Sequence, residues 1–68
     1  MRDQAVRVAL HIPAHVVARM AGVSRPTLAI YELDPLAVKD LDRRGRIAAV
    51  YSELREMIRR FPIDATAA

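Results

Sequence analysis

Cysteine is absent from this chain of 68 residues, and glycine occurs only twice. Without cysteine no disulfide can stabilise the fold, and the absence fits a reducing cytoplasm. A zinc site is not expected either, because two histidines without a thiolate make a poor ligand set. A domain this small buries only about 60% of the surface that its unfolded chain exposes. We therefore expect oligomerisation to add stability.

Long apolar runs are also missing, and so is the apolar–polar alternation of β-strands. The most apolar stretch, residues 5–21, contains Pro13 and is interrupted by Arg7, His11, His15 and Arg19. It falls short of the roughly 20 apolar residues that a membrane helix needs, and nothing in the chain resembles a signal peptide. We expect a soluble, cytoplasmic protein that makes no membrane contact.

Positive charge exceeds negative charge, with eleven Lys and Arg residues against eight Asp and Glu and a net charge of +3. Lys39 is the only lysine. Arginine presents a planar fork that suits phosphate groups and guanine edges, so a polyanion partner is one interpretation. A coding preference for arginine explains the composition equally well. The charge balance alone therefore supports a polyanion only weakly.

The spacing of apolar residues predicts an all-α fold, because they recur every three or four positions, as on one face of a helix. Prolines and glycines punctuate this pattern at helix ends. We predict a small helix-turn-helix bundle of four to five helices in one domain over residues 1–62, followed by a frayed tail over 63–68. Its helices are expected within 2–10, over 13–20 and 25–33, briefly after Asp34, and over 41–61 as a long C-terminal helix.

Residues 13–33 have the pattern of a helix-turn-helix, two short helices joined by a glycine turn. Gly22 can adopt the left-handed backbone that ends the first helix, and Ser24 is a good N-cap for the second. Ala18 is small where the two helices cross, while Leu28 and Tyr31 give the second helix an inner face. The outer face then carries Ser24, Arg25, Pro26, Ala29 and Ile30. In this motif the N-terminal residues of the second helix enter the DNA major groove.

The segment VVARMAGVSRPTLAIYE resembles the helix-turn-helix of the lambda-repressor-like, Cro/XRE-type transcriptional regulators, and the likeness spans residues 13–33. Their pattern holds small, glycine, apolar, capping and acidic positions in one register, matched here by Ala18, Ala21, Gly22, Val23, Ser24, Thr27, Leu28 and Glu32. Many members also pair an arginine of the first helix with the acidic residue near the end of the third. The resemblance therefore implies a pair between Arg7 and Glu32, with two ordinary surface charges as the alternative.

This resemblance implies sequence-specific binding of double-stranded DNA by a small, repressor-like transcriptional regulator of the phage-like or mobile-element kind. We expect it to act as a homodimer at the nucleoid without a cofactor. The family's base-reading positions fall on Arg25, Pro26 and Ile30, and its phosphate or groove-wall positions on Ser24 and Thr27. Pro26 and Ile30 offer no side-chain hydrogen bond. Arg25 is then the one strong reader, expected on the O6 and N7 atoms of guanine.

Two apolar residues and two basic residues complete the expected DNA surface. Ile30 or Ala29 can contact a thymine methyl group, and burial of Ile30 under the final helix is the alternative. The second helix lacks the Ser-Gln start that is usual in the family, whose glutamine contacts phosphate. We expect His15 or Arg19 to replace that contact in part.

The long C-terminal helix carries two further expectations. Arg43, Arg44 and Arg46 surround Gly45 at its start, where the helix dipole disfavours cations, so a nearby DNA phosphate is expected. A solvated face balanced by Asp40 and Asp42 is the alternative, and Gly45 itself predicts a kink or a later start. The apolar stripe is expected to form a two-fold dimer, with packing onto the chain's own helix-turn-helix as the alternative: Val50, Tyr51, Leu54, Met57, Ile58 and Phe61.

Other classes of function are less favoured. His11 and His15 are four residues apart, but Pro13 separates them and no acid or thiol is near, so no metal is expected. No serine has a matching base and no glycine-rich phosphate loop occurs, so an enzyme is not expected. Two alternatives stay open: an antitoxin-like protein-interaction module, and a MerR-like or excisionase-like DNA-binding protein, whose usual wing sequence is absent.

Overall fold

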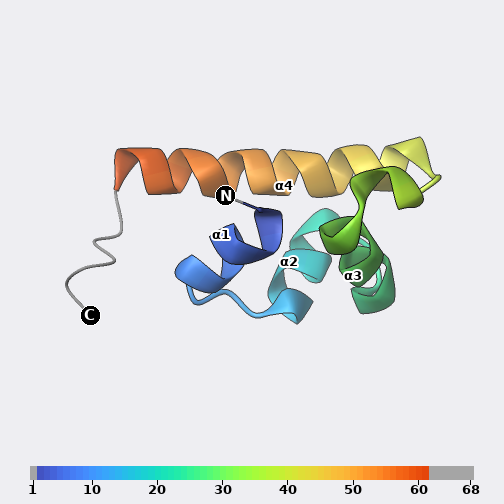
Figure 1. Ribbon diagram of the computed structural model, residues 1–68, viewed down its shortest axis with the longest axis horizontal. Coiled ribbons are helices and arrows are strands. Elements are labelled where there is room, and N and C mark those ends of the chain that lie inside the picture. The colour runs from blue at the N-terminus through green and yellow to red at the C-terminus, as the bar shows by residue number, and fades with distance from the viewer. Residues whose placement is uncertain (1, 62–68) are drawn as a thin grey trace.

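The computed structural model describes residues 2–61, and each regular element among them is helical (Figure 1). The elements are α1 (Asp3–Ala9), α2 (Ala14–Ala21), α3 (Arg25–Leu33), the 3-10 turn η1 (Pro35–Ala37) and α4 (Leu41–Arg60). The predicted all-α bundle with a long C-terminal helix is thereby confirmed. The last residue of the predicted domain, 62, and the predicted tail over 63–68 lie outside the described residues.

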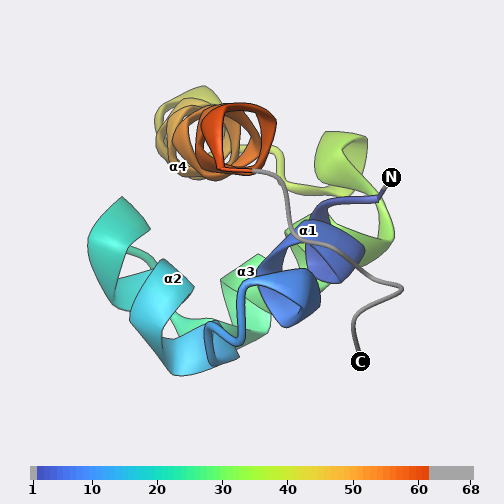
Figure 2. The ribbon, with the colours of Figure 1, turned by 90° about the vertical axis from the view of Figure 1, so that its left-hand side faces the viewer.

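The helix α4 lies across the other three helices. It forms one side of the domain in Figure 1, and the view along it in Figure 2 places α1 and α2 on opposite sides beneath it. Its 20 residues span about 30 Å at 1.5 Å per residue, most of the domain's longest dimension of 39 Å. The linker between α1 and α2 lies at the edge away from α4. No helix within residues 2–61 is both long enough and apolar enough to cross a membrane.

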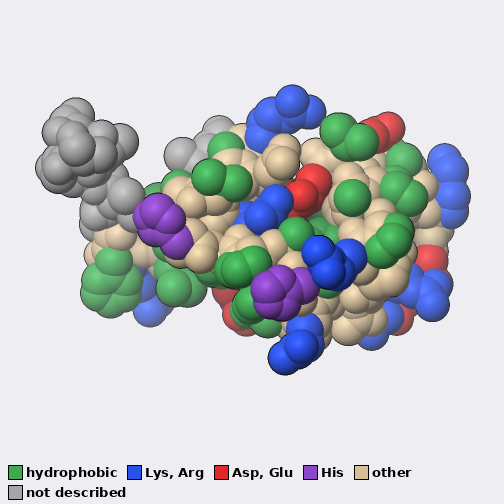
Figure 3. Space-filling view, turned by 90° about the horizontal axis from the view of Figure 1, so that it is seen from below, with side chains coloured by type: hydrophobic (Ala, Val, Ile, Leu, Met, Phe, Trp, Pro, Cys, Tyr) green, Lys and Arg blue, Asp and Glu red, His purple; other side chains and the backbone are tan. Residues whose placement is uncertain are grey.

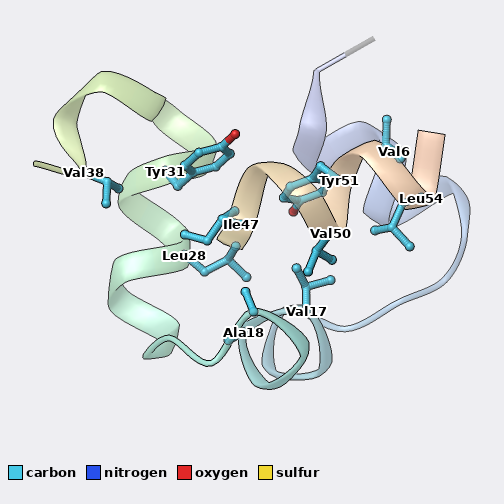
Figure 4. Packing of buried hydrophobic residues seen from close by; sticks show 11 residues of the cluster. Val6, Val17, Ala18, Leu28, Tyr31, Val38, Ile47, Val50, Tyr51 and Leu54 are labelled. Atoms are coloured by element: carbon cyan, nitrogen blue, oxygen red, sulfur yellow. The ribbon is translucent and has the colours of Figure 1, made fainter. Parts of the chain in front are cut away.

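The hydrophobic core fills the space between α4 and the other helices, as Figure 4 shows. Ala18 is 2% exposed and packs in this core together with Leu28, which fits the expected small residue between α2 and α3. The rings of Tyr31 and Tyr51 stack with their centroids 6.2 Å apart. The buried residues come from all four helices and from the loop before α4: Val6, Val17, Ala18, Ala21, Leu28, Tyr31, Val38, Ile47, Val50, Tyr51 and Leu54.

The predicted dimer stripe on α4 needs correction. Val50, Tyr51 and Leu54 are at most 8% exposed, because they pack in the domain's own core and are not available to a second copy. Ile58 is half-buried against the same core. Met57 and Phe61 are 47% and 75% exposed and face outward. Packing onto the chain's own helix-turn-helix therefore accounts for most of this stripe.

The turn between α2 and α3 follows the predicted geometry. Gly22 has φ of 67° and ψ of 37°, the left-handed conformation that glycine adopts without a Cβ penalty. The Val23 N–H donates to the Ala18 carbonyl at 2.9 Å, and the Gly22 N–H donates to the Arg19 carbonyl at 3.1 Å. These two bonds satisfy carbonyls that the end of α2 leaves without intrahelical partners.

The long helix begins at Leu41, as predicted, and continues through Gly45, so the alternative of a start after Gly45 is wrong. The Asp40 carboxylate caps the first turn by accepting hydrogen bonds from the N–H groups of Asp42 at 2.9 Å and Arg43 at 3.1 Å. Two apolar residues of the helices are exposed to solvent, Met20 of α2 at 52% and Leu41 of α4 at 73%.

Candidate nucleic-acid interface

The outer face of α3 is open to solvent. Arg25, Pro26, Ala29 and Ile30 are all exposed, and Ile30 at 47% exposure is not buried under α4. The predicted outward orientation of these four side chains is therefore confirmed. The neighbours of Arg25 among these four residues are small or apolar and have no hydrogen-bonding side chain. The Arg25 guanidinium is therefore the main hydrogen-bonding group in the centre of the outer face of α3.

The start of α3 adds two hydroxyl groups to this surface. The Ser24 hydroxyl accepts a hydrogen bond from the Thr27 N–H at 3.2 Å and lies 2.9 Å from the Thr27 hydroxyl. Ser24 is exposed and Thr27 is half-buried. Only one of the two hydroxyl hydrogens is needed between these oxygens, so the other can donate to an acceptor outside the protein, such as a phosphate oxygen.

Basic side chains of α2 and the preceding linker extend the surface. His15 and Arg19 are exposed and four residues apart, so they lie one turn from each other on the same face of α2. His11, in the linker before α2, is also exposed and has a φ of 58°, an unusual value outside glycine. Seen from the side away from α4, both histidines are visible, one next to Lys or Arg side chains and the other farther from them (Figure 3). His11 was not among the predicted interface residues.

Apart from Arg7, the arginines of the described residues fall into two groups. All six on α4 are engaged by the protein itself: Arg43 with Asp40, Arg44 with the Val38 carbonyl, Arg46 with Asp42, Arg55 with Asp3, and Arg59 and Arg60 with Glu56. Arg19 and Arg25, in contrast, make no ion pair or side-chain hydrogen bond to any other residue of the 2–61 range, and the same holds for Arg2 and Lys39 at the edges of the fold. The charges of the α2–α3 surface are thus left uncompensated.

The distribution of acidic residues explains this difference. No Asp or Glu occurs between Asp3 and Glu32, a stretch that contains all of α2 and nearly all of α3. Any cation that points outward from this stretch lacks a carboxylate within three or four residues along its helix. This gap is visible in the sequence, and it is the signal that would have added His11 to the predicted surface.

The predicted phosphate-contacting cluster at the start of α4 has partners of its own. Arg43 donates to Asp40 at 2.8 Å, Arg44 donates to the Val38 carbonyl at 3.0 Å, and Arg46 lies 3.2 Å from Asp42. Hydrogen bonds from the backbone N–H of Arg43 hold the pKa of Asp40 below its usual value, so this carboxylate stays charged. The alternative, a solvated face balanced by Asp40 and Asp42, matches these contacts, and a phosphate contact by the cluster stays a prediction.

The expected pair between Arg7 and Glu32 is confirmed. The Arg7 Nε lies 2.9 Å from Glu32 Oε2 and its second nitrogen 3.2 Å from Oε1, and both side chains are nearly buried, at 11% and 8% exposure. Arg7 also donates to the Ile12 carbonyl at 3.2 Å. The hydrogen bond to Glu32 raises the pKa of Arg7. This pair ties the C-terminal part of α3 to α1.

Tyr51 of α4 joins this pair, a contact that the sequence analysis did not predict. Its hydroxyl donates to Glu32 Oε2, the same oxygen that accepts from Arg7. Burial, followed by the bond to Glu32, raises the pKa of Tyr51. Glu32 therefore connects three helices, and the orientation of α3 is fixed relative to both α1 and α4.

Comparisons with known proteins add no family to this description: no family model, curated protein or solved structure matches the chain. Within residues 2–61, no three His, Cys, Asp or Glu side chains are grouped in a way that could hold a metal ion. What the described surface offers is a set of uncompensated cations beside hydroxyl and apolar groups, an arrangement suited to binding a polyanion.

Proposed function

We propose that the chain binds double-stranded DNA through α2 and α3 and acts as a transcriptional regulator of the lambda-repressor-like, Cro/XRE type. One observation carries the proposal: Arg19 and Arg25 are exposed on the helix-turn-helix without a protein partner in the described residues, while every arginine of α4 is engaged. An unpaired guanidinium keeps its full charge and its donors for phosphate or guanine.

Different residues of this surface have different roles in DNA binding, according to their chemistry. Arg25 reads guanine through its two parallel N–H donors, and Ile30 or Ala29 contacts a thymine methyl group. Arg19 and His15 of α2, with the hydroxyls at the start of α3, bind phosphate and set the register on the duplex. Because only Arg25 can form strong hydrogen bonds with bases, the shape of the DNA contributes the rest of the specificity.

The test begins with selection of bound duplexes from a random pool, followed by fluorescence anisotropy at several salt concentrations. Arg25→Gln is expected to lose about 1–3 kcal/mol on the selected site and to relax the preference for one base pair. Arg19→Gln is expected to weaken the binding of all DNA sequences alike. It should also reduce the slope of log affinity against log salt concentration by about the amount that one phosphate contact contributes.

Arg59→Gln is the matched control, because it removes the same charge from an arginine that is already paired with Glu56. It is expected to leave DNA affinity nearly unchanged. Equal losses in Arg25→Gln and Arg59→Gln would show that net charge alone attracts DNA. A chain that selects no sequence and whose binding does not weaken with salt is not a DNA-binding regulator.

A protein-interaction module is the second candidate, supported by three exposed leucines. Leu33, Leu36 and Leu41 are 77%, 66% and 73% exposed where α3 passes through η1 into α4. Apolar side chains grouped on a surface are typical of protein contacts. Failure of the DNA selection, together with a partner protein whose binding is lost in Leu36→Glu, would favour this candidate over DNA.

A further inference from the structure

A groove runs between the C-terminal end of α2 and the middle of α4. Its volume is about 290 Å³, and it is lined by Met20, Ala21, Arg46, Ala49, Val50 and Glu53. Four of the lining side chains are apolar, and Met20 among them is half exposed. Arg46 and Glu53 are the charged residues of the lining. Ala21 and Val50 also belong to the core, whereas none of Arg25, Pro26, Ala29 and Ile30 lines this groove.

The two charged residues are placed symmetrically on α4. Arg46 and Glu53 are seven residues apart, which is two helical turns or about 10.5 Å, so they lie on the same side of the helix with Ala49 and Val50 between them. Arg46 bridges only to Asp42, an exposed pair at 3.2 Å. Glu53 takes part in no ion pair with another residue of the 2–61 range. One acidic and one basic group thus flank an apolar centre at equal distances.

We propose that a second copy of this chain occupies the groove, with the two α4 helices antiparallel around a two-fold axis beside Ala49. Reversing the helix direction places Arg46 of one copy opposite Glu53 of the partner subunit, and the converse pair forms at the other end. A two-fold interface must be complementary to itself, and this arrangement of charges meets that condition.

The neighbouring side chains suit close contact between two helices. Gly45, Ala49 and Ser52 are exposed and small, so no bulky side chain of these three positions holds a second α4 away. Met57 lies one turn beyond Glu53 on the same side of α4 and is 47% exposed. Met20 and Met57 are flexible side chains that can fill the remaining space. The proposed dimer contact therefore differs from the predicted one, because Val50, Tyr51 and Leu54 are buried in the core.

The position of the groove is compatible with binding DNA in the dimer. In Figure 2, α2 and α4 bound the side of the domain opposite α1, while the linker between α1 and α2 lies at the edge away from α4. A two-fold axis perpendicular to α4 therefore leaves the linker edges of both copies open and facing the same way. This last step rests on the proposed function, whereas the association itself does not.

The first test uses the absence of cysteine from the chain. Ala49→Cys places a single thiol beside the axis, and we expect rapid formation of a disulfide-linked dimer under mild oxidation, because the two Cα atoms come within about 7 Å. Ala48→Cys is the matched control, since this exposed neighbour is turned about 100° around the helix. Equal or absent crosslinking in the two variants would overturn the proposed axis.

The second test is a charge exchange followed by sedimentation equilibrium. Glu53→Arg and Arg46→Glu each replace two attractive pairs by repulsive ones, and each is expected to weaken dimerisation about tenfold or more. The double variant restores opposite charges and is expected to recover most of the wild-type association. Lys39→Glu, in the loop before α4, is the control for net charge. Circular dichroism checks that each variant keeps its helices.

The outcomes separate this proposal from the proposed function. A wild-type chain that stays monomeric at about 100 μM, far above ordinary dimer Kd values, overturns the dimer even if it binds DNA. A double variant no better than either single variant also overturns it. A dimer with the expected charge dependence that selects no DNA contradicts the proposed function and leaves the dimer standing.

Discussion

The arginines of α4 and the arginines of the α2–α3 surface are chemically identical, but their neighbouring residues differ. On α4, acids three or four residues away meet each of Arg43, Arg46, Arg59 and Arg60. On α2 and the start of α3, Arg19 and Arg25 have no such neighbour. Paired surface charges of this kind stabilise a helix only slightly, whereas unpaired cations on one face create a positive potential. The placement of acids, more than the number of arginines, separates the two surfaces.

Arg7 is the exception that tests this comparison, because it lies in the acid-free stretch and is nevertheless paired. Arg7→Met is expected to lower the free energy of unfolding by about 3–5 kcal/mol, since it leaves the nearly buried Glu32 without its cation. Urea denaturation followed by circular dichroism measures this loss. Arg19→Met, at an exposed and unpaired position, is the control and should change stability by less than about 0.5 kcal/mol. Similar losses in both variants would contradict the distinction.

Tyr51 gives the next largest effect and depends on pH. Tyr51→Phe removes the bond to the Glu32 carboxylate and is expected to cost about 1–3 kcal/mol at pH 7. Because folding raises the pKa of Tyr51, the stabilisation is complete below the ordinary tyrosine pKa of 10.0 and is lost as the pH rises above it, where the unfolded chain ionises first.

Measuring the free energy of unfolding between pH 8 and pH 11 tests whether stability falls with rising pH as expected. The wild-type free energy of unfolding should fall more steeply above pH 10 than that of Tyr51→Phe. Burial also raises the pKa of Tyr31, so part of the slope should remain in the variant. A slope that is identical in the two proteins would rule out a role for Tyr51 in alkaline unfolding.

The two glycines differ in backbone conformation, so replacing each by alanine should change the stability of the fold in opposite directions. Gly22→Ala is expected to cost about 1–2 kcal/mol, because its φ of 67° places a Cβ in the strained left-handed region, 2.9 Å from Arg46. Gly45→Ala is expected to gain up to about 1 kcal/mol, because a Cβ there would meet no atom within 4 Å beyond its own turn of this regular helix. Thermal unfolding of both variants measures the difference, and a loss of stability in Gly45→Ala would contradict it.

Much of the fold could be predicted because it depends on local chemistry. Proline and glycine positions, together with apolar spacing, located the four α-helices to within a few residues. The outward face of α3 followed from helical periodicity, since burying Leu28 and Tyr31 turns Arg25 and Ile30 toward solvent. The pair between Arg7 and Glu32 came from the resemblance to known regulators, because residues 25 positions apart give no local signal.

Other features depend on contacts between segments distant in the sequence. The apolar stripe of α4 is equally suited to a partner chain or to the chain's own core, and only the packed fold shows that Val50, Tyr51 and Leu54 are buried within the domain. The bond from Tyr51 to Glu32 and the groove beside Met20 likewise require α4 to lie against α2 and α3.

By itself the sequence determined the helices, their capped ends and an acid-free stretch that leaves cations uncompensated, because each of these depends on neighbours within about one helical turn. Tertiary structure alone decided which apolar residues form the core, which arginines are neutralised across helices and where a second copy can bind. The physical reason is that burial and self-complementarity are properties of surfaces, and these surfaces exist only once α4 packs across α1, α2 and α3.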